Sequence, residues 1–274
     1  MFILPFFISL SLTPICIKLS AICGAMDYPD GIRKLHTKPT AKLGGIPIYI
    51  SFLLTSLSYL LTSGLSLAVM LGGAVALLGG VIDDTIDILW HQKLLLQCCA
   101  GIVGVSILLT EADALSFVGS VALSVALING FNLLDGVDGL SASVAILSTS
   151  FIAVILGGES PTILVFAILG FLPYNFPAKI FLGESGASFI GYAVSMLLIA
   201  NLKGGGNASL LFAVALPLAE PFFTFLRRIV LFKNPFRADR CHFHHKLKDR
   251  GFSDASVVLI MLTLTILFGF LAVI

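Results

Sequence analysis

The stretch LSLAVMLGGAVALLGGVI, residues 65–82, decides the fold, because it is an unbroken apolar run long enough to cross a bilayer. The run ends directly in Asp83 and Asp84, and Asp87 follows within one helical turn. Carboxylates at a bilayer boundary are costly, so they usually mark ion, proton or phosphate chemistry. Adjacent carboxylates also attract a counter-ion, and their oxygens suit Mg2+. A structural pair that caps a helix is the alternative interpretation.

The composition sets the protein class. Hydrophobic residues make up 58% of the chain and charged residues 11%, whereas about a quarter of a typical soluble domain is charged. We therefore predict an all-α fold, a polytopic transmembrane helix bundle that forms one integral-membrane domain over residues 1–274. The five cysteines show no framework spacing, so we interpret them as reduced packing residues. The N-terminus lacks the basic region of a cleaved signal peptide, so we expect a retained first helix.

The apolar runs of the chain predict about ten spans. The candidate spans cover residues 1–22, 44–63, 65–82, 93–110, 115–131, 139–156, 161–175, 186–202, 207–226 and 255–274. If the N-terminus faces outside, the loops that face inside are 23–43, 83–92, 132–138, 176–185 and 227–254.

The distribution of basic residues tests this arrangement independently, because the spans were chosen on apolarity alone. The inside loops and the inner helix ends hold every lysine and arginine except Lys203. An excess of basic residues on the cytoplasmic side is the usual pattern of membrane proteins. We therefore expect both termini outside and an active site on the cytoplasmic face, built from several loops.

The first inside loop is rich in basic residues. Residues 27–45 read DYPDGIRKLHTKPTAKLGG and contain Arg33, Lys34, His36 and Lys38 ahead of a Gly-Gly helix start. Basic side chains beside a helix N-terminus suit an anion such as phosphate. A basic loop that only sets the topology is the alternative.

The third inside loop, NGFNLLDGVDG at residues 129–139, is polar within an apolar chain. Asn132, Asp135 and Asp138 recur at a spacing of three, so they share one face if the segment is helical. The glycines of the segment allow a ligand to approach the backbone closely. A purely structural turn is the alternative. The fourth loop, FLGESGA at residues 181–187, has the form of a capped helix start.

The fifth inside loop contains the run DRCHFHH, residues 239–245. His242, His244 and His245 form a cationic cluster with Arg240 and neighbouring basic residues. Zinc is one candidate ligand, because histidine and cysteine both bind it. The arginines disfavour a cation and favour phosphate, and a solvated basic loop is the third possibility.

Six stretches taken together resemble one known family. They read DYPDGIRKLH, LGGIPIY, GVIDDTIDILWHQKLLLQ, NGFNLLDGVDGLSA, FLGESGASFIGY and DRCHFHHKL. They are similar to the polyprenyl-phosphate N-acetylhexosamine-1-phosphate transferases, the glycosyltransferase 4 type of the WecA, TagO and MraY superfamily. The resemblance covers nearly the whole chain from Asp27 to Gly251. The HFHH form resembles the WecA type, which favours a UDP-N-acetylhexosamine over the muramyl-pentapeptide nucleotide.

The resemblance implies a reaction. Undecaprenyl phosphate attacks the β-phosphorus of a UDP-N-acetylhexosamine, most simply UDP-GlcNAc, and UMP leaves. The lipid-linked product begins a cell-surface glycan in the bacterial inner membrane. Mg2+, with Mn2+ as a substitute, bridges the phosphates. The implied partners are the two substrates and membrane lipid, and nucleic acid is not among them. The resemblance leaves open whether the protein forms a homodimer.

The resemblance also implies roles for individual residues. Catalytic roles fall to Asp83, Asp84 and Asp87. Nucleotide-sugar binding falls to Lys38, Asn132, Asp135, Asp138, Phe181, Arg240, His242, His244 and His245, with Phe181 stacked on uracil. Lipid-phosphate binding falls to Arg33, Lys34, His36 and Lys93, and metal binding to Asp84 and Glu184.

Two positions depart from the family pattern. Glu184 stands where the family usually has the aspartate that binds Mg2+, and Glu220 stands where relatives commonly carry aspartate. Mg2+ tolerates geometric error poorly, so the extra methylene of Glu184 matters. Both changes preserve charge, and we expect activity to be retained. A non-catalytic homologue with a lipid-binding or assembly role, and a transporter, are the rival interpretations.

Overall fold

The computed structural model describes residues 3–29, 38–57, 63–232 and 242–274. Each of the ten predicted apolar runs contains helix within these residues. The helices are α1 (Leu4–Cys23), α2 (Gly45–Ser56), α3 (Gly64–Ile86), α4 (Trp90–Leu108), α5 (Ala114–Leu134), α6 (Leu140–Leu156), α7 (Glu159–Asn175), α8 (Gly183–Lys203), the 3-10 helix η2 (Ala208–Val214), α9 (Ala215–Val230), α10 (Phe243–Asp249) and α11 (Asp254–Val273). The strands are β1 (Met26–Asp27) and β2 (Thr40–Ala41).

The described part of the chain contains seven helical segments long and apolar enough to cross a membrane, with η2 and α9 taken as one segment. The helices α2 and α6 are apolar but shorter. The prediction of an all-α, multi-pass membrane protein is therefore confirmed. The count of ten spans and the orientation of the termini stay predictions.

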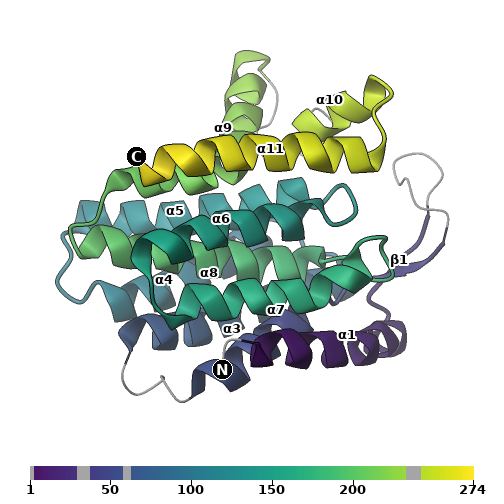
Figure 1. Cartoon of the computed structure of the whole chain (residues 1–274), viewed down its shortest axis with the longest axis horizontal. Coiled ribbons are helices and arrows are strands. Elements are labelled where there is room, and N and C mark those ends of the chain that lie inside the picture. Colours follow the sequence, from purple (N-terminus) through teal and green to yellow (C-terminus); the bar gives the residue numbers. More distant parts are fainter. Residues whose placement is uncertain (1–2, 30–37, 58–62, 233–241) are drawn as a thin grey trace.

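The helix α8 forms the centre of the bundle, and most of its length is buried between α3 and α5 (Figure 1). Close packing depends on small residues, as is common between membrane helices. A Cβ on Gly72 or on Gly104 would lie 2.0 Å from the hydroxyl oxygen of Tyr192. That hydroxyl donates a hydrogen bond of 2.7 Å to the carbonyl oxygen of Ala68. The interior ring of Tyr192 thus fixes α8 against α3 and α4.

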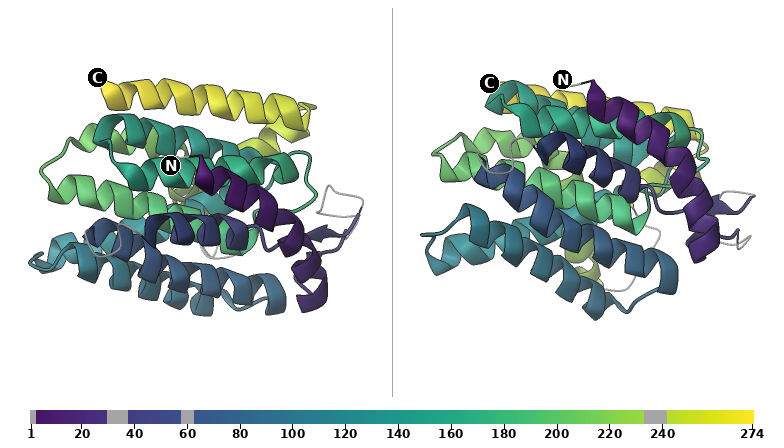
Figure 2. Two further views of the ribbon diagram at one scale, coloured as in Figure 1. Left: turned by 60° about the horizontal axis from the view of Figure 1, so that its bottom comes forward. Right: turned by 90° about the horizontal axis from the view of Figure 1, so that it is seen from below.

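Most of the long helices run side by side, whereas α9 protrudes from the bundle (Figures 1 and 2). The helix α1 runs toward β1 and α11 runs away from α10, so both chain ends lie away from β1 and α10. The connections that carry the polar motifs gather at the end of the bundle that carries β1 and α10.

A small strand pairing ties two of these connections together. The strand β1 pairs antiparallel with β2, and Ala41 of β2 bridges Ile180. The N–H of Phe181 donates a 2.8 Å hydrogen bond to the carbonyl oxygen of Ala41. The first loop and the α7–α8 loop, which are far apart in the sequence, therefore lie side by side.

Candidate active site

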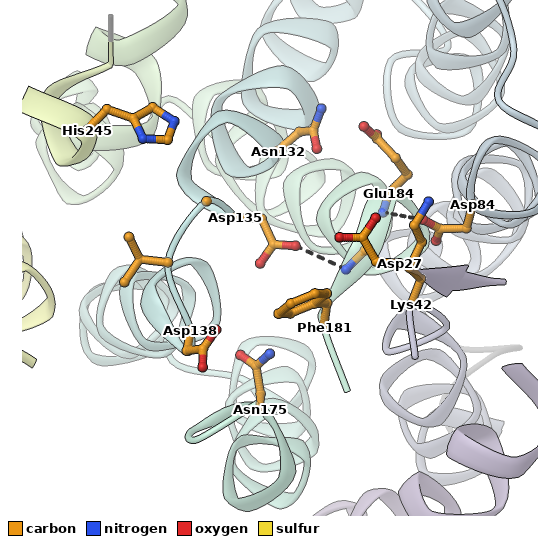
Figure 3. Close-up of a pocket in the computed structure, with 13 residues that line it drawn as sticks. Asp27, Lys42, Asp84, Asn132, Asp135, Asp138, Asn175, Phe181, Glu184 and His245 are labelled. Carbon is orange, nitrogen blue, oxygen red and sulfur yellow. Dashed lines mark hydrogen bonds between the residues drawn. The ribbon is translucent and has the colours of Figure 1, made fainter. Parts of the chain in front are cut away.

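A cavity of about 350 Å3 lies at the end of the bundle that carries β1 (Figure 3). Residues from all five loops that the sequence predicts to face inside line this cavity. Seven of the lining residues belong to the candidate site predicted from the sequence: Asp84, Asn132, Asp135, Asp138, Phe181, Glu184 and His245. The structure therefore brings most of the candidate site together, and we call this space the polar cavity.

Asp84 anchors the start of α8. Its carboxylate is buried, and the two oxygens accept backbone N–H groups from Glu184 at 3.0 Å and from Ser185 at 2.9 Å. The first N–H groups of a helix have no partner within the helix, so Asp84 supplies the cap from another helix. Leu182, the N-cap residue, provides no side-chain cap. The helix start predicted at the FLGESGA stretch is present, but its cap comes from α3.

Asp83 faces a different partner. The ammonium group of Lys93 contacts one oxygen of Glu184 and lies 3.5 Å from Oδ2 of Asp83. Oδ1 of Asp83 accepts the N–H of Ile88 at 2.9 Å. Asp87 is exposed, occupies the C-cap of α3 with a φ of 48°, and does not line the polar cavity. The three aspartates of the motif thus lie in three different environments.

Asp135 and Asp138 follow the end of α5 in a turn, not in a continued helix. Asp135 accepts the N–H of Gly183 at 3.0 Å, and Asp138 accepts the N–H of Ala178 at 3.1 Å. Burial raises the pKa of Asp135 well above its usual value, and the nearby carboxylates Asp84 and Glu184 add to this effect. The turn therefore places two acids against the α7–α8 loop, and a bound cation would favour the charged form of Asp135.

The carboxyl groups of the cavity wall fit a divalent cation. Oε2 of Glu184 is buried and has no hydrogen-bond partner within the described part of the protein. Among the described residues, no three His, Cys, Asp or Glu side chains lie close enough to enclose a metal. Mg2+ is commonly held by one or two carboxylates together with substrate phosphates, so a complete protein cage is not required. The donors present fit an ion shared with a phosphorylated substrate.

The three histidines of the HFHH run lie in different environments. His245 lines the polar cavity, whereas His242 does not. His244 is fully buried, and a Cβ on Gly136 would lie 2.5 Å from its Nε2. Burial lowers the pKa of His244 to about 3, with further contributions from His245 and His242. His244 is therefore a neutral packing group between α10 and the α5–α6 turn.

A second, larger cavity of about 860 Å3 lies between α4, α5 and α9, and we call it the apolar groove. Its walls are mainly apolar, with side chains such as Leu94, Leu218 and Phe222. Among the described residues, Lys93 and His242 are the basic side chains that line it. Asn132 lines both the apolar groove and the polar cavity, so the two spaces meet at this residue.

Some predicted residues are not placed in either cavity. Lys38 is exposed and lines neither of them. Four further predicted residues lie outside the described part of the chain: Arg33, Lys34, His36 and Arg240.

Three polar side chains of the polar cavity were missing from the predicted site: Asp27, Lys42 and Asn175. Asp27 belongs to one of the six stretches and Lys42 directly precedes another, which was a usable signal. Asn175 had no such signal. It is buried, its amide donates to the carbonyl oxygen of Ile180 at 3.0 Å, and its Oδ1 has no hydrogen-bond partner among the described residues.

Comparison with known proteins agrees with this geometry. Residues 66–201 match the model of glycosyl transferase family 4. A protein of Bacillus subtilis named probable undecaprenyl-phosphate N-acetylglucosaminyl 1-phosphate transferase is 32% identical, over 100% of this chain and 83% of its own length. Two proteins named undecaprenyl-phosphate alpha-N-acetylglucosaminyl 1-phosphate transferase also match. That of Thermotoga maritima is 30% identical over 90% of this chain and 80% of its own length, and that of Escherichia coli K12 is 28% identical over 91% and 76%.

Proposed function

This chain belongs to glycosyl transferase family 4, and we propose that it transfers N-acetylglucosamine 1-phosphate from UDP-N-acetylglucosamine to undecaprenyl phosphate. One observation carries the proposal: an acidic polar cavity meets an apolar groove at Asn132. A water-soluble nucleotide sugar suits the first space, and a polyprenyl chain suits the second. The reacting phosphates of both substrates can then meet where the two spaces join.

The polar cavity is the donor site in this proposal. The ring of Phe181 lies among the labelled side chains of the cavity (Figure 3), where it can stack on the uracil. Asn175, Asp138 and His245 supply polar contacts around the nucleotide. Lys42 provides positive charge for the diphosphate.

Glu184 and Asp84 are the residues that would hold Mg2+. When bound, the ion neutralises the charge that develops on the diphosphate as UMP leaves. The chain itself contributes the buried Oε2 of Glu184, which has no hydrogen-bond partner among the described residues. Asp84 keeps Glu184 in place through its bond to the Glu184 amide.

Asp83 and Lys93 position the phosphate of the lipid acceptor in this proposal. Lys93 borders the apolar groove and pairs with Asp83 and Glu184, so it lies between the two substrate spaces. The second pKa of a phosphate monoester is near 6, so the acceptor is already largely ionised at neutral pH. Positioning of the acceptor by Asp83 therefore matters more than proton abstraction.

The membrane arrangement completes the proposal. Ten spans with both termini outside place the basic loops and the polar cavity on the cytoplasmic side of the bacterial inner membrane. The positive-inside distribution of lysine and arginine supports this orientation. The donor then reaches the polar cavity from the cytoplasm, and the lipid reaches the apolar groove from the bilayer.

The test is UMP release by the purified protein in nanodiscs with undecaprenyl phosphate, Mg2+ and a panel of UDP-N-acetylsugars, with UDP-glucose as the comparison donor. We expect release with UDP-N-acetylglucosamine, its loss on addition of EDTA, and none with UDP-glucose. A Glu184→Gln variant, purified in the same way, serves as the matched inactive control. No release with any donor, from protein that still binds the lipid, would replace the transferase with a non-catalytic lipid-binding homologue.

A further inference from the structure

The HFHH run is divided between the two substrate spaces. His245 lines the polar cavity and is absent from the lining of the apolar groove. His242 lines the apolar groove and is absent from the lining of the polar cavity. The two histidines lie three residues apart but line different cavities, so one shared role does not fit the geometry.

Glu220 holds His242 in its place. Glu220 is buried in α9, and its Oε2 lies 3.4 Å from Nδ1 of His242. The hydroxyl of Thr224, one turn further along α9, lies 3.4 Å from the same ring nitrogen. A carboxylate and a hydroxyl at Nδ1 fix the orientation of the imidazole, as carboxylate partners do for other functional histidines.

The carboxylate of Glu220 also caps the start of α10, in place of the His242 side chain. His242 is the N-cap residue of α10, yet its side chain makes no capping hydrogen bond. Oε1 of Glu220 instead accepts the N–H of Phe243 at 3.0 Å. The imidazole is therefore not used to stabilise the helix start, which would be the ordinary structural reason for a polar side chain there.

The apolar groove needs positive charge at its polar end if it receives a phosphate. Its described lining contains two side chains that can carry such charge, Lys93 and His242. The ammonium of Lys93 already faces the carboxylates of Asp83 and Glu184. A phosphate monoester carries close to two negative charges at neutral pH, so Lys93 alone does not balance it.

We propose that His242 binds the phosphate of the polyprenyl acceptor and not the donor nucleotide, and that Glu220 is the positioning residue that holds it there. The inference rests on the proposed function and divides the histidine run into an acceptor group, His242, and a donor group, His245. Glu220 and Thr224 both lie on the Nδ1 side of the ring, so they set the orientation in which His242 borders the apolar groove.

The chain supplies its own probe for the test. Trp90 is the only tryptophan of the sequence, and it lines the apolar groove. Its fluorescence can follow the binding of a short polyprenyl phosphate without any turnover. The matched polyprenol, which lacks the phosphate, measures the contribution of the apolar walls alone. Binding of radiolabelled UDP-N-acetylglucosamine by equilibrium dialysis measures the donor site separately.

We expect His242→Gln and Glu220→Gln to weaken polyprenyl phosphate binding roughly ten-fold or more, because each removes one contact to a charged group or its support. Polyprenol binding and donor binding should stay within about two-fold of the wild type. His245→Gln should give the reverse pattern, with weaker donor binding and unchanged lipid binding. Glu220→Asp should restore most of the phosphate affinity, and in an active preparation Glu220→Gln should raise the KM for the lipid more than it lowers kcat.

Three results would overturn the inference. They are unchanged phosphate binding in His242→Gln, an equal loss of polyprenol binding, or a loss confined to the donor. His242→Gln does not remove the cap at Phe243, so it remains informative if Glu220→Gln fails to fold. Phosphate-selective binding that depends on His242, in a protein that releases no UMP, would reject the proposed transfer and leave the inference standing.

Discussion

The carboxylate of Asp84 accepts the backbone N–H of Glu184 at 3.0 Å, so these two residues are joined through a helix start and not through their side chains. The contact locks the end of α3 to the beginning of α8. It also brings Asp84 to the positive end of the α8 dipole, where a buried negative charge is stabilised. The side chain of Glu184 is left to face Lys93 and the polar cavity.

Asp84→Asn should lower UMP release at least a hundred-fold while the protein remains folded and inserted. The amide side chain keeps one acceptor oxygen but turns an N–H donor toward a backbone N–H, so one of the two capping bonds is lost. We expect a loss of about 2 kcal/mol in the free energy of unfolding. Activity and thermal unfolding of the same detergent-solubilised preparation check both effects. Turnover above a tenth of the wild-type rate would reject the assignment.

Gly80→Ala should force α3 and α8 apart. A Cβ on Gly80 would lie 2.4 Å from the carbonyl oxygen of Glu184 and 2.5 Å from Cα of Ser185, and these backbone atoms cannot turn away. We expect a loss of stability of about 2 kcal/mol or more and a large loss of activity. The matched control is Gly119→Ala in α5, where an added Cβ meets nothing within 4 Å. Equal melting temperatures for the two variants would contradict the packing argument.

Glu184→Asp should keep transfer within about three-fold of the wild type or raise it, whereas Glu184→Gln should lose it. Aspartate preserves the charge that a metal and Lys93 both require, and glutamine removes it. Binding of Mn2+, followed by electron paramagnetic resonance, gives a readout independent of turnover. An inactive Glu184→Asp that still binds Mn2+ would show that the pocket is built around the longer side chain.

Asp83→Asn should impair transfer much more than Asp87→Asn, although both residues belong to one motif. Asp83 lies 3.5 Å from the ammonium of Lys93, whereas Asp87 is an exposed helix C-cap outside both cavities. Values of kcat and KM for the lipid, measured for both variants, decide the point. A larger loss in Asp87→Asn would return Asp87 to the catalytic group.

The burial of His244 should make stability depend on pH. Its folded-state pKa of about 3 lies below the ordinary value, so the unfolded chain binds the extra proton first. The stabilisation is complete above about pH 6.5 and is lost as the pH falls toward 3, by up to about 1.4 kcal/mol per pH unit. His244→Leu should flatten the melting temperature between pH 7 and pH 5. The same slope in both proteins would exclude His244 as its source.

Much of the candidate site could be predicted from the sequence. The predicted loops supplied Asp84, Asp135, Asp138 and Glu184, and the structure brings all four to one cavity. The sequence could not tell Asp83 from Asp87, because the difference arises from Lys93 on the following helix.

Buried contacts across the fold were also invisible in the sequence. Asn175 ends α7, and the turn that follows brings the carbonyl oxygen of Ile180 back to its buried amide; no local pattern predicts such a contact.

The sequence by itself determined the membrane class, the helical segments and the side on which the polar motifs gather, because hydrophobicity and charge act residue by residue against the bilayer. Only the tertiary structure decided which partner each polar residue meets. Asp84 caps a helix a hundred residues away, His244 packs beneath Gly136, and His242 faces the apolar groove while His245 faces the polar cavity. These relationships depend on how helices far apart in the chain pack together, and burial and hydrogen bonding between them then set the role of each side chain.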